Sequence, residues 1–193
     1  MKMEKEITVS VTTDYETLEK ELNEYNFTKK EEYMVNDIYL INDDLDLFKM
    51  KKLDILKKCI LIREVENIEK ELLYKYKKYD LNGNILEQGK VKCPIIDIDK
   101  AIDFMNAINY KELFKINDKC IVFANDKTEL VVQLVNDKYI FIEMESEGSF
   151  NDRKYANIDE MIEDLFSYNL SIDKSNIFVK KAEIILNEIL NSN

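Results

Sequence analysis

The sequence predicts an α+β fold in which an antiparallel β-sheet or barrel carries helices on its outside. Strand-like segments rich in β-branched and aromatic residues follow one another through short turns, and no crossover helix separates the strands expected between residues 58 and 93. Strands joined in this way pair antiparallel. A chain of 193 residues, 46% of them hydrophobic, can supply one sizeable core, so a single domain over residues 1–193 is expected.

The first half of the chain reads as one strand, one helix and four further strands. Thr13 is expected to open the helix, because Glu16 completes a capping box three residues later. An Asn-Gly pair at Asn82 and Gly83 is a strong hairpin signal, and Asn67 marks another turn. The expected strands are 4–12, 34–41, 58–66, 70–79 and 85–93, with the helix ending near Asn26 and a loop or short helix at 42–52.

The second half reads as a helix, three strands and two closing helices. Ile98, Ile102 and Met105 recur at helical spacing, which predicts a helix over about 97–108. Strands are expected at 118–124, 128–135 and 138–145, and helices at about 158–168 and 177–191. The expected barrel core therefore spans about 4–146, and the C-terminal helices lie within about 157–191.

The net charge and the hydropathy pattern limit the partners. The formal charge is −11, from 39 acidic and 28 basic residues, so long-range electrostatics repel nucleic acid and anionic membranes. No stretch approaches the roughly 20 apolar residues of a membrane span, and the first residues lack the apolar core of a signal peptide. We expect a cytoplasmic protein that contacts neither nucleic acid nor a membrane.

Missing residue types limit the chemistry. The chain has no histidine, which excludes Ser-His, Cys-His and His-metal sites, and its three glycines form no Gly-rich phosphate loop. Cys59, Cys93 and Cys120 are odd in number and widely spaced, so they are expected to be reduced, structural thiols. Chemistry must therefore use carboxylates, lysine, arginine or tyrosine.

Two Glu-x-Glu pairs lie on the first and last expected strands. Glu4 and Glu6 share one face of the first strand, because side chains alternate with period two, and Glu143 and Glu145 share one face of the last. A single pair of this kind is usually a solvent-facing strand end. Two pairs together favour a shared site for a divalent cation, which would relieve their repulsion.

Basic residues alternate in the same way on the strands between. Arg63 ends one apolar run, and the pairs Lys75/Lys77 and Lys90/Lys92 each share one strand face. Taken singly, such residues most often form a solvated sheet face. If they pointed into a closed barrel, they would form a positive pocket able to hold phosphate oxygens.

In order and spacing these segments resemble the CYTH superfamily, which includes class IV adenylyl cyclases, thiamine triphosphatases and inorganic triphosphatases. The resemblance covers roughly residues 4–146. The matched motifs are its opening Glu-x-Glu at Glu4 and Glu6, its Asp-x-Tyr at Asp37 and Tyr39, the second arginine of its Leu-Arg-x-Arg at Arg63, the lysine of its next strand at Lys75, and its last Glu-x-Glu at Glu143 and Glu145. The resemblance implies a closed antiparallel eight-stranded β-barrel, the triphosphate tunnel, with helices packed outside.

The resemblance also implies a site and a ligand. It implies that a small-molecule triphosphate or polyphosphate is bound by Arg63, Lys75, Lys77, Lys90, Lys92 and Lys119, the last being the nearest candidate for a later basic motif. It implies that Mg²⁺ or Mn²⁺ is bound by Glu4, Glu6, Glu143 and Glu145.

Three departures from the superfamily pattern leave the activity open. Thr8, Leu61 and Gln133 stand where a lysine, an arginine and an aspartate are usual. Each lost charge-assisted contact is worth about 1.5–3 kcal/mol, so catalysis could fall by orders of magnitude. One hypothesis is a metal-dependent triphosphatase or adenylyl cyclase-like enzyme, and the other is a catalytically degenerate protein that binds polyphosphate or another anion. A barrel without a ligand and a homodimer also stay open.

Overall fold

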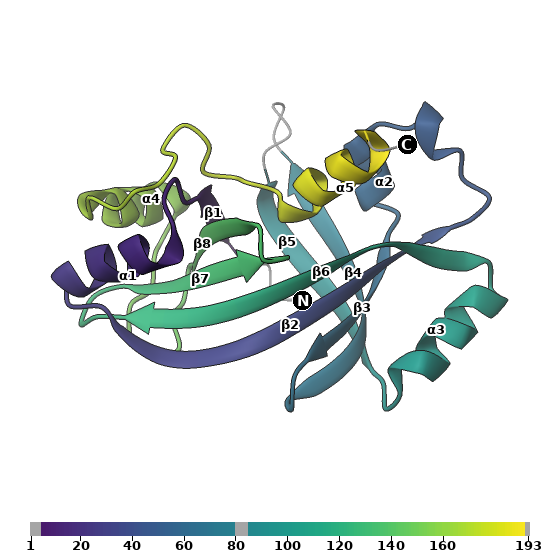
Figure 1. The fold of residues 1–193 in the computed structure, drawn as a ribbon, viewed down its shortest axis with the longest axis horizontal. Coiled ribbons are helices and arrows are strands. Elements are labelled where there is room, and N and C mark those ends of the chain that lie inside the picture. The colour runs from purple at the N-terminus through teal and green to yellow at the C-terminus, as the bar shows by residue number, and fades with distance from the viewer. Residues whose placement is uncertain (1–4, 80–84, 192–193) are drawn as a thin grey trace. The chain divides into compact units, whose positions relative to one another are not determined.

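A computed structural model describes residues 5–79 and 85–191, with only the backbone described for residues 77–79 and 85–88. Within this part, eight strands form one antiparallel sheet in the order β1-β8-β7-β6-β2-β3-β4-β5 (Figure 1). The strands are β1 (Glu6–Ser10), β2 (Thr28–Asn42), β3 (Ile60–Val65), β4 (Glu69–Tyr79), β5 (Ile85–Pro94), β6 (Tyr110–Ala124), β7 (Glu129–Val135) and β8 (Tyr139–Glu145). The α+β class and the antiparallel pairing are confirmed. The closed barrel is not confirmed, because β1 and β5 are the two ends of the hydrogen-bonded order.

Five α-helices and a 3₁₀ turn accompany the sheet in the described part of the chain. They are α1 (Tyr15–Glu24), the 3₁₀ turn Leu47–Lys49, α2 (Lys52–Leu56), α3 (Ile98–Ala107), α4 (Ile158–Ser167) and α5 (Lys181–Asn191). None of the described helices has the length and apolar character needed to cross a membrane.

The chain forms two compact units. The first contains residues 1–33, 79–87 and 118–179, and the second contains residues 34–78, 88–117 and 180–193. The long strands β2 and β6 contribute to both units. The expectation of a single domain stays a prediction.

In the first unit, an apolar core lies between one sheet face and two helices. Alternate residues of β1 and β8, such as Ile7 and Ile142, are fully buried on this face, where Leu18 of α1 and Leu165 of α4 pack in the same cluster. Because side chains alternate along a strand, the residues between them lie on the opposite face. That opposite face carries Glu6, Glu143 and Glu145.

In the second unit, α3 covers one face of β2 and β3. Leu40, Ile62 and Met105 are buried together, with Ile38 and Ile102 packed against them. The opposite face of the same strands carries the charged Asp37 and Arg63 beside the buried Tyr39 and Leu61. Separately, α5 packs on α2, and its Ile185 and Leu186 are buried.

Turns and caps follow the sequence closely, with one correction. Asn67, Asn136 and Asp137 have positive φ angles of 60°, 51° and 53°, which confirms two of the predicted hairpin turns. The turn predicted at residues 82–84 lies outside the described residues. Thr13 is not the cap of α1; the Asp14 carboxylate accepts from the backbone N–H of Thr17 at 2.8 Å.

Three predicted boundaries were wrong. Strand β2 begins six residues before position 34, in an exposed, charged stretch. Strand β6 begins eight residues before position 118, in a stretch where the buried Phe114 and Ile116 alternate with exposed polar residues. Helix α5 begins at Lys181 and not at residue 177. The reason is that the Thr8 N–H donates to the Ile177 carbonyl at 3.1 Å and the Val179 N–H to the Thr8 carbonyl at 3.0 Å, which holds residues 177–179 extended against β1.

The three cysteines are free thiols, as predicted from their number and spacing. Cys59 and Cys120 are buried, and Cys93 is exposed. Burial raises the pKa of Cys59 to about 12, so this thiol stays protonated at neutral pH.

Candidate functional site

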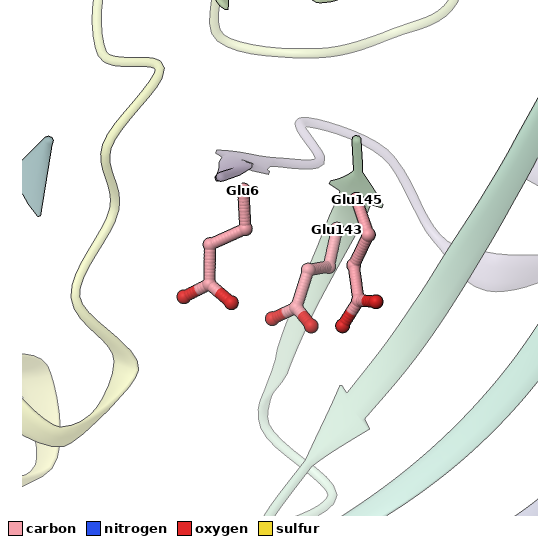
Figure 2. A group of neighbouring side chains, drawn as sticks. All are labelled: Glu6, Glu143 and Glu145. Carbon is pink, nitrogen blue, oxygen red and sulfur yellow. The ribbon is translucent and has the colours of Figure 1, made fainter. Parts of the chain in front are cut away.

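Three carboxylates come together on the first unit, from the first and last strands of the chain. In the antiparallel pair β1–β8, Glu6 lies directly opposite Glu145, and Thr8 lies opposite Glu143. The side chains of Glu6, Glu143 and Glu145 therefore share the sheet face opposite the one that packs against α1 and α4, and Figure 2 shows them side by side. We call these three residues the acidic cluster.

The geometry of the acidic cluster suits a cation. One carboxylate oxygen from each residue lies within 4.8 Å of the others. Two oxygens bound to one divalent ion are separated by at most about twice the metal–oxygen distance, which is roughly 4–5 Å for Mg²⁺ and Ca²⁺. Glu6 and Glu143 are half-buried and Glu145 is exposed, so the cluster is open to an ion from solvent. All-oxygen donor sets are the preferred ligands of hard cations.

A cavity of about 140 Å³ adjoins the acidic cluster. Glu143 and Glu145 line it, together with three further glutamates. The other lining residues are Glu31, Tyr33, Val122, Glu129, Val131, Glu147, Gly148, Ser149, Phe150, Asn151 and Tyr155. No lysine or arginine is among these lining residues, so within the first unit the cavity is an environment for cations.

A tyrosine lies against the carboxylates of this cavity. Burial raises the pKa of Tyr33, and the nearby Cys120 and the carboxylates of Glu143 and Glu145 raise it further. The Tyr33 phenol is therefore a hydrogen-bond donor at any physiological pH and not a base.

Most metal ligands implied by the family resemblance meet in space. Glu6, Glu143 and Glu145 are brought together, whereas Glu4 lies outside the described residues. Sequence reasoning missed the other cavity glutamates. Glu31 and Tyr33 alternate on the unpredicted beginning of β2, and that alternation was the one available signal.

The second unit carries a row of alternating charges across four strands. Asp37 on β2 lies opposite Arg63 on β3, and Arg63 lies opposite Glu71 on β4. The Lys92 ammonium on β5 lies 3.1 Å from the Glu71 carboxylate. We call Asp37, Arg63, Glu71 and Lys92 the charge ladder.

Arg63 is engaged by Asp37 in a two-point contact. The Arg63 Nε donates to Asp37 Oδ1 at 2.7 Å and one terminal nitrogen donates to Oδ2 at 2.6 Å. Burial acts to raise the pKa of Asp37, but the hydrogen bonds from Arg63 and the positive charge of Lys75 outweigh it and lower this pKa. Asp37 is therefore ionised and its side chain is only 7% exposed, so the pair is a strong, partly desolvated ion pair.

The remaining predicted phosphate ligands have different surroundings. Lys75 and Lys181 both lie close enough to Asp37 to lower its pKa. Lys181, on α5, was not among the residues predicted from the sequence. Lys90 is half-buried on β5, and the side chain of Lys77 lies outside the described part. Lys119 forms an ion pair with Glu32 at 2.9 Å and is not among the residues that line the acidic cavity.

Comparison with known proteins shows which solved structures share this fold. No protein-family model matches the chain, and no curated protein matches its sequence. Among solved structures, the PH1819 protein of Pyrococcus horikoshii OT3 is similar with a TM-score of 0.63 and 15% identity, over 96% of this chain and 99% of that one. A conserved hypothetical protein of Pyrococcus furiosus has a TM-score of 0.63 and 18% identity over 93% and 99%. A protein of Vibrio parahaemolyticus described as a “putative adenylate cyclase” has a TM-score of 0.58 and 11% identity over 98% of each chain. At these identities the likeness shows a shared fold.

Proposed function

Because the chain has the fold of these structures, and with it the CYTH-like fold that its sequence motifs indicate, we propose that it binds a triphosphate with the help of Mg²⁺ or Mn²⁺ and hydrolyses it. The observation that carries the proposal is that Glu6, Glu143 and Glu145 lie together although they come from the first and last strands along the chain. Separate Glu-x-Glu motifs are common, but a register that joins them on one face is specific.

In this proposal the acidic cluster binds the divalent cation. When bound, the cation supplies Lewis-acid polarisation of a phosphoryl oxygen. The half-buried carboxylates of Glu6 and Glu143 hold it from adjacent strands, and Glu145 contributes from the end of β8. Like charges opposite each other repel, and the cation removes that cost.

The basic side chains of the second unit are proposed to bind phosphate oxygens. Lys75, Lys92 and Arg63 lie on the sheet face opposite α3, where Asp37 and Glu71 offset part of their charge. A polyphosphate would compete with these carboxylates for the same donors. Replacement of Lys75 by alanine is therefore expected to weaken tripolyphosphate binding measurably in calorimetry.

The test of the cation site is a Mn²⁺ titration followed by electron paramagnetic resonance. Glu6→Gln and Glu145→Gln are expected to weaken Mn²⁺ binding by tenfold or more, since each removes a charged ligand and keeps the side-chain shape (about 1.4 kcal/mol per tenfold). The matched control is Glu163→Gln, which removes the same charge from an exposed position on α4. Wild-type protein that takes up no Mn²⁺ at millimolar concentration, with or without tripolyphosphate, would overturn the proposal.

A binding protein without turnover is the second candidate, and two observations favour it. Thr8, which stands where the family carries a lysine, is buried and faces Glu143 across the strand pair. The guanidinium fork of Arg63 is engaged by Asp37. A screen of nucleoside triphosphates, thiamine triphosphate and tripolyphosphate with Mg²⁺ or Mn²⁺ distinguishes the candidates by release of phosphate, pyrophosphate or cyclic nucleotide.

A further inference from the structure

The segment that follows β8 folds back on itself beside the acidic cluster. The Ser146 N–H donates to the Lys5 carbonyl at 3.0 Å, and the Tyr155 N–H donates to the Ser146 carbonyl at 2.9 Å. Glu147 and Lys154 form an antiparallel bridge one step further along. The base of this excursion is thus fixed to the residue that precedes Glu6.

The tip of the same segment is held by one carboxylate from another strand. Glu129, the first residue of β7, accepts the backbone N–H groups of Ser149 at 2.8 Å and Phe150 at 2.7 Å on a single oxygen, Oε2. Hydrogen bonds from N–H groups to an ionised carboxylate are short and strong. Glu129 therefore holds the loop through a single acceptor oxygen.

A glycine makes this close approach possible. A Cβ atom at position 148 would lie 2.8 Å from Glu129 Oε2 and 2.9 Å from Asn151 Oδ1, closer than such contacts are tolerated. Gly148 is one of only three glycines in the chain. Its place at this contact indicates that the contact itself is specified by the sequence.

The held tip forms a wall of the cavity that adjoins the acidic cluster. Residues 148–151 line this cavity together with Glu143 and Glu145. Glu145 is the last residue of β8 and is exposed, and only Ser146 and Glu147 separate it from the tip. Glu145 thus lies where the ladder with β1 ends and the segment held by Glu129 begins.

We propose that Glu129 is a positioning residue of the acidic cluster: it holds the tip of residues 148–150 and thereby fixes the end of β8 from which Glu145 reaches a cation. This inference rests on the proposed function, because it assumes that the acidic cluster binds a divalent ion. Glu129 acts through its acceptor oxygen and the loop, and not as a ligand.

The experiment compares three variants by titration with Mn²⁺ alone. Glu129→Ala removes the acceptor and is expected to weaken Mn²⁺ binding about tenfold, the usual effect of removing a group that orients a metal ligand. Glu129→Gln keeps a carbonyl oxygen in place and is expected to stay within about threefold of wild type. Gly148→Ala keeps the glutamate, but the added Cβ would push the Glu129 carboxylate away from the tip amides, so this variant should resemble Glu129→Ala. Glu163→Gln is again the control for loss of charge.

Hydrogen exchange of the Ser149 and Phe150 amides in metal-free protein gives an independent readout, and exchange is expected to be faster in Glu129→Ala than in wild type. If wild type binds Mn²⁺ and Glu129→Ala binds it equally well, the positioning role is overturned while the proposed function stands. If Glu129→Gln loses as much affinity as Glu129→Ala, the charge acts directly and the positioning role is also overturned. If wild type binds no Mn²⁺, the proposed function falls, and the positioning role with it.

Discussion

The two compact units arrange their charges in opposite ways. The acidic cluster of the first unit places like charges opposite each other on adjacent strands, with Glu6 facing Glu145. The charge ladder of the second unit alternates sign from strand to strand, with Asp37, Arg63 and Glu71 in one row. Like charges directly opposite each other destabilise a sheet, whereas opposite charges stabilise it. The ladder thus stabilises the folded state by itself, whereas the cluster would be stabilised by the cation that we propose it binds.

The largest effect is expected in the ladder. Asp37→Ala leaves the Arg63 guanidinium, whose side chain is 20% exposed, without its two-point partner. Breaking a buried ion pair from one side costs about 3–5 kcal/mol of unfolding free energy, and this is the loss we expect in urea unfolding at pH 7.

The control for this change is Asp46→Ala. Asp46 pairs with Lys49 at 2.7 Å, but their side chains are 50% and 83% exposed, so the loss should be below about 1 kcal/mol. Equal losses of unfolding free energy in Asp37→Ala and Asp46→Ala would show that the ladder pair contributes no more than an exposed surface ion pair.

The ladder should also weaken in acid. The pKa of Asp37 in the folded protein lies below its ordinary value, because the hydrogen bonds from Arg63 and the charge of Lys75 outweigh the effect of burial. A lowered folded pKa contributes stability that is fully present above the unfolded pKa of about 3.9 and is lost as the pH falls through the folded value. The difference in urea midpoint between wild type and Asp37→Asn should therefore be constant near pH 7 and shrink below about pH 4. A difference that grows on acidification would contradict this assignment.

Removal of a carboxylate charge should have the opposite effect on the unfolding free energy in the acidic cluster. With a chelator present, Glu145→Gln removes a like charge opposite Glu6 and is expected to raise the unfolding free energy by about 0.2–1 kcal/mol. With excess Mn²⁺ the wild type should instead have the higher unfolding free energy, because it is stabilised by the ion that it binds. Urea unfolding in the two conditions measures this, and a destabilised Glu145→Gln in chelator would mean that the cluster is satisfied without a cation.

The sequence predicted faces better than it predicted partners. Alternation alone put Glu143 and Glu145 on one strand face. The meeting of the first and last strands was expected from closure of a barrel, and β1 does pair with β8, although a closed barrel is not confirmed. The pairing of Asp37 with Arg63 depends on the β2–β3 register, which no local pattern specifies. The beginning of β2 was missed because its exposed, charged residues show no hydrophobic alternation. Residues 177–179 read as helical but pair with the backbone of β1, a tertiary contact that overrides local propensity.

The smallest effect is expected at Lys119, which the family resemblance placed among the phosphate ligands. Its ammonium pairs with Glu32, and both side chains are more than one-third exposed, at 40% for Lys119 and 35% for Glu32. Glu32 also accepts from Lys29, so the loss of one partner leaves another in place. Lys119→Gln should therefore change the unfolding free energy by less than about 0.5 kcal/mol.

Lys119→Gln should also leave tripolyphosphate affinity unchanged in calorimetry, whereas Lys75→Ala is expected to weaken it. Equal losses of affinity in the two variants would return Lys119 to the set of phosphate ligands.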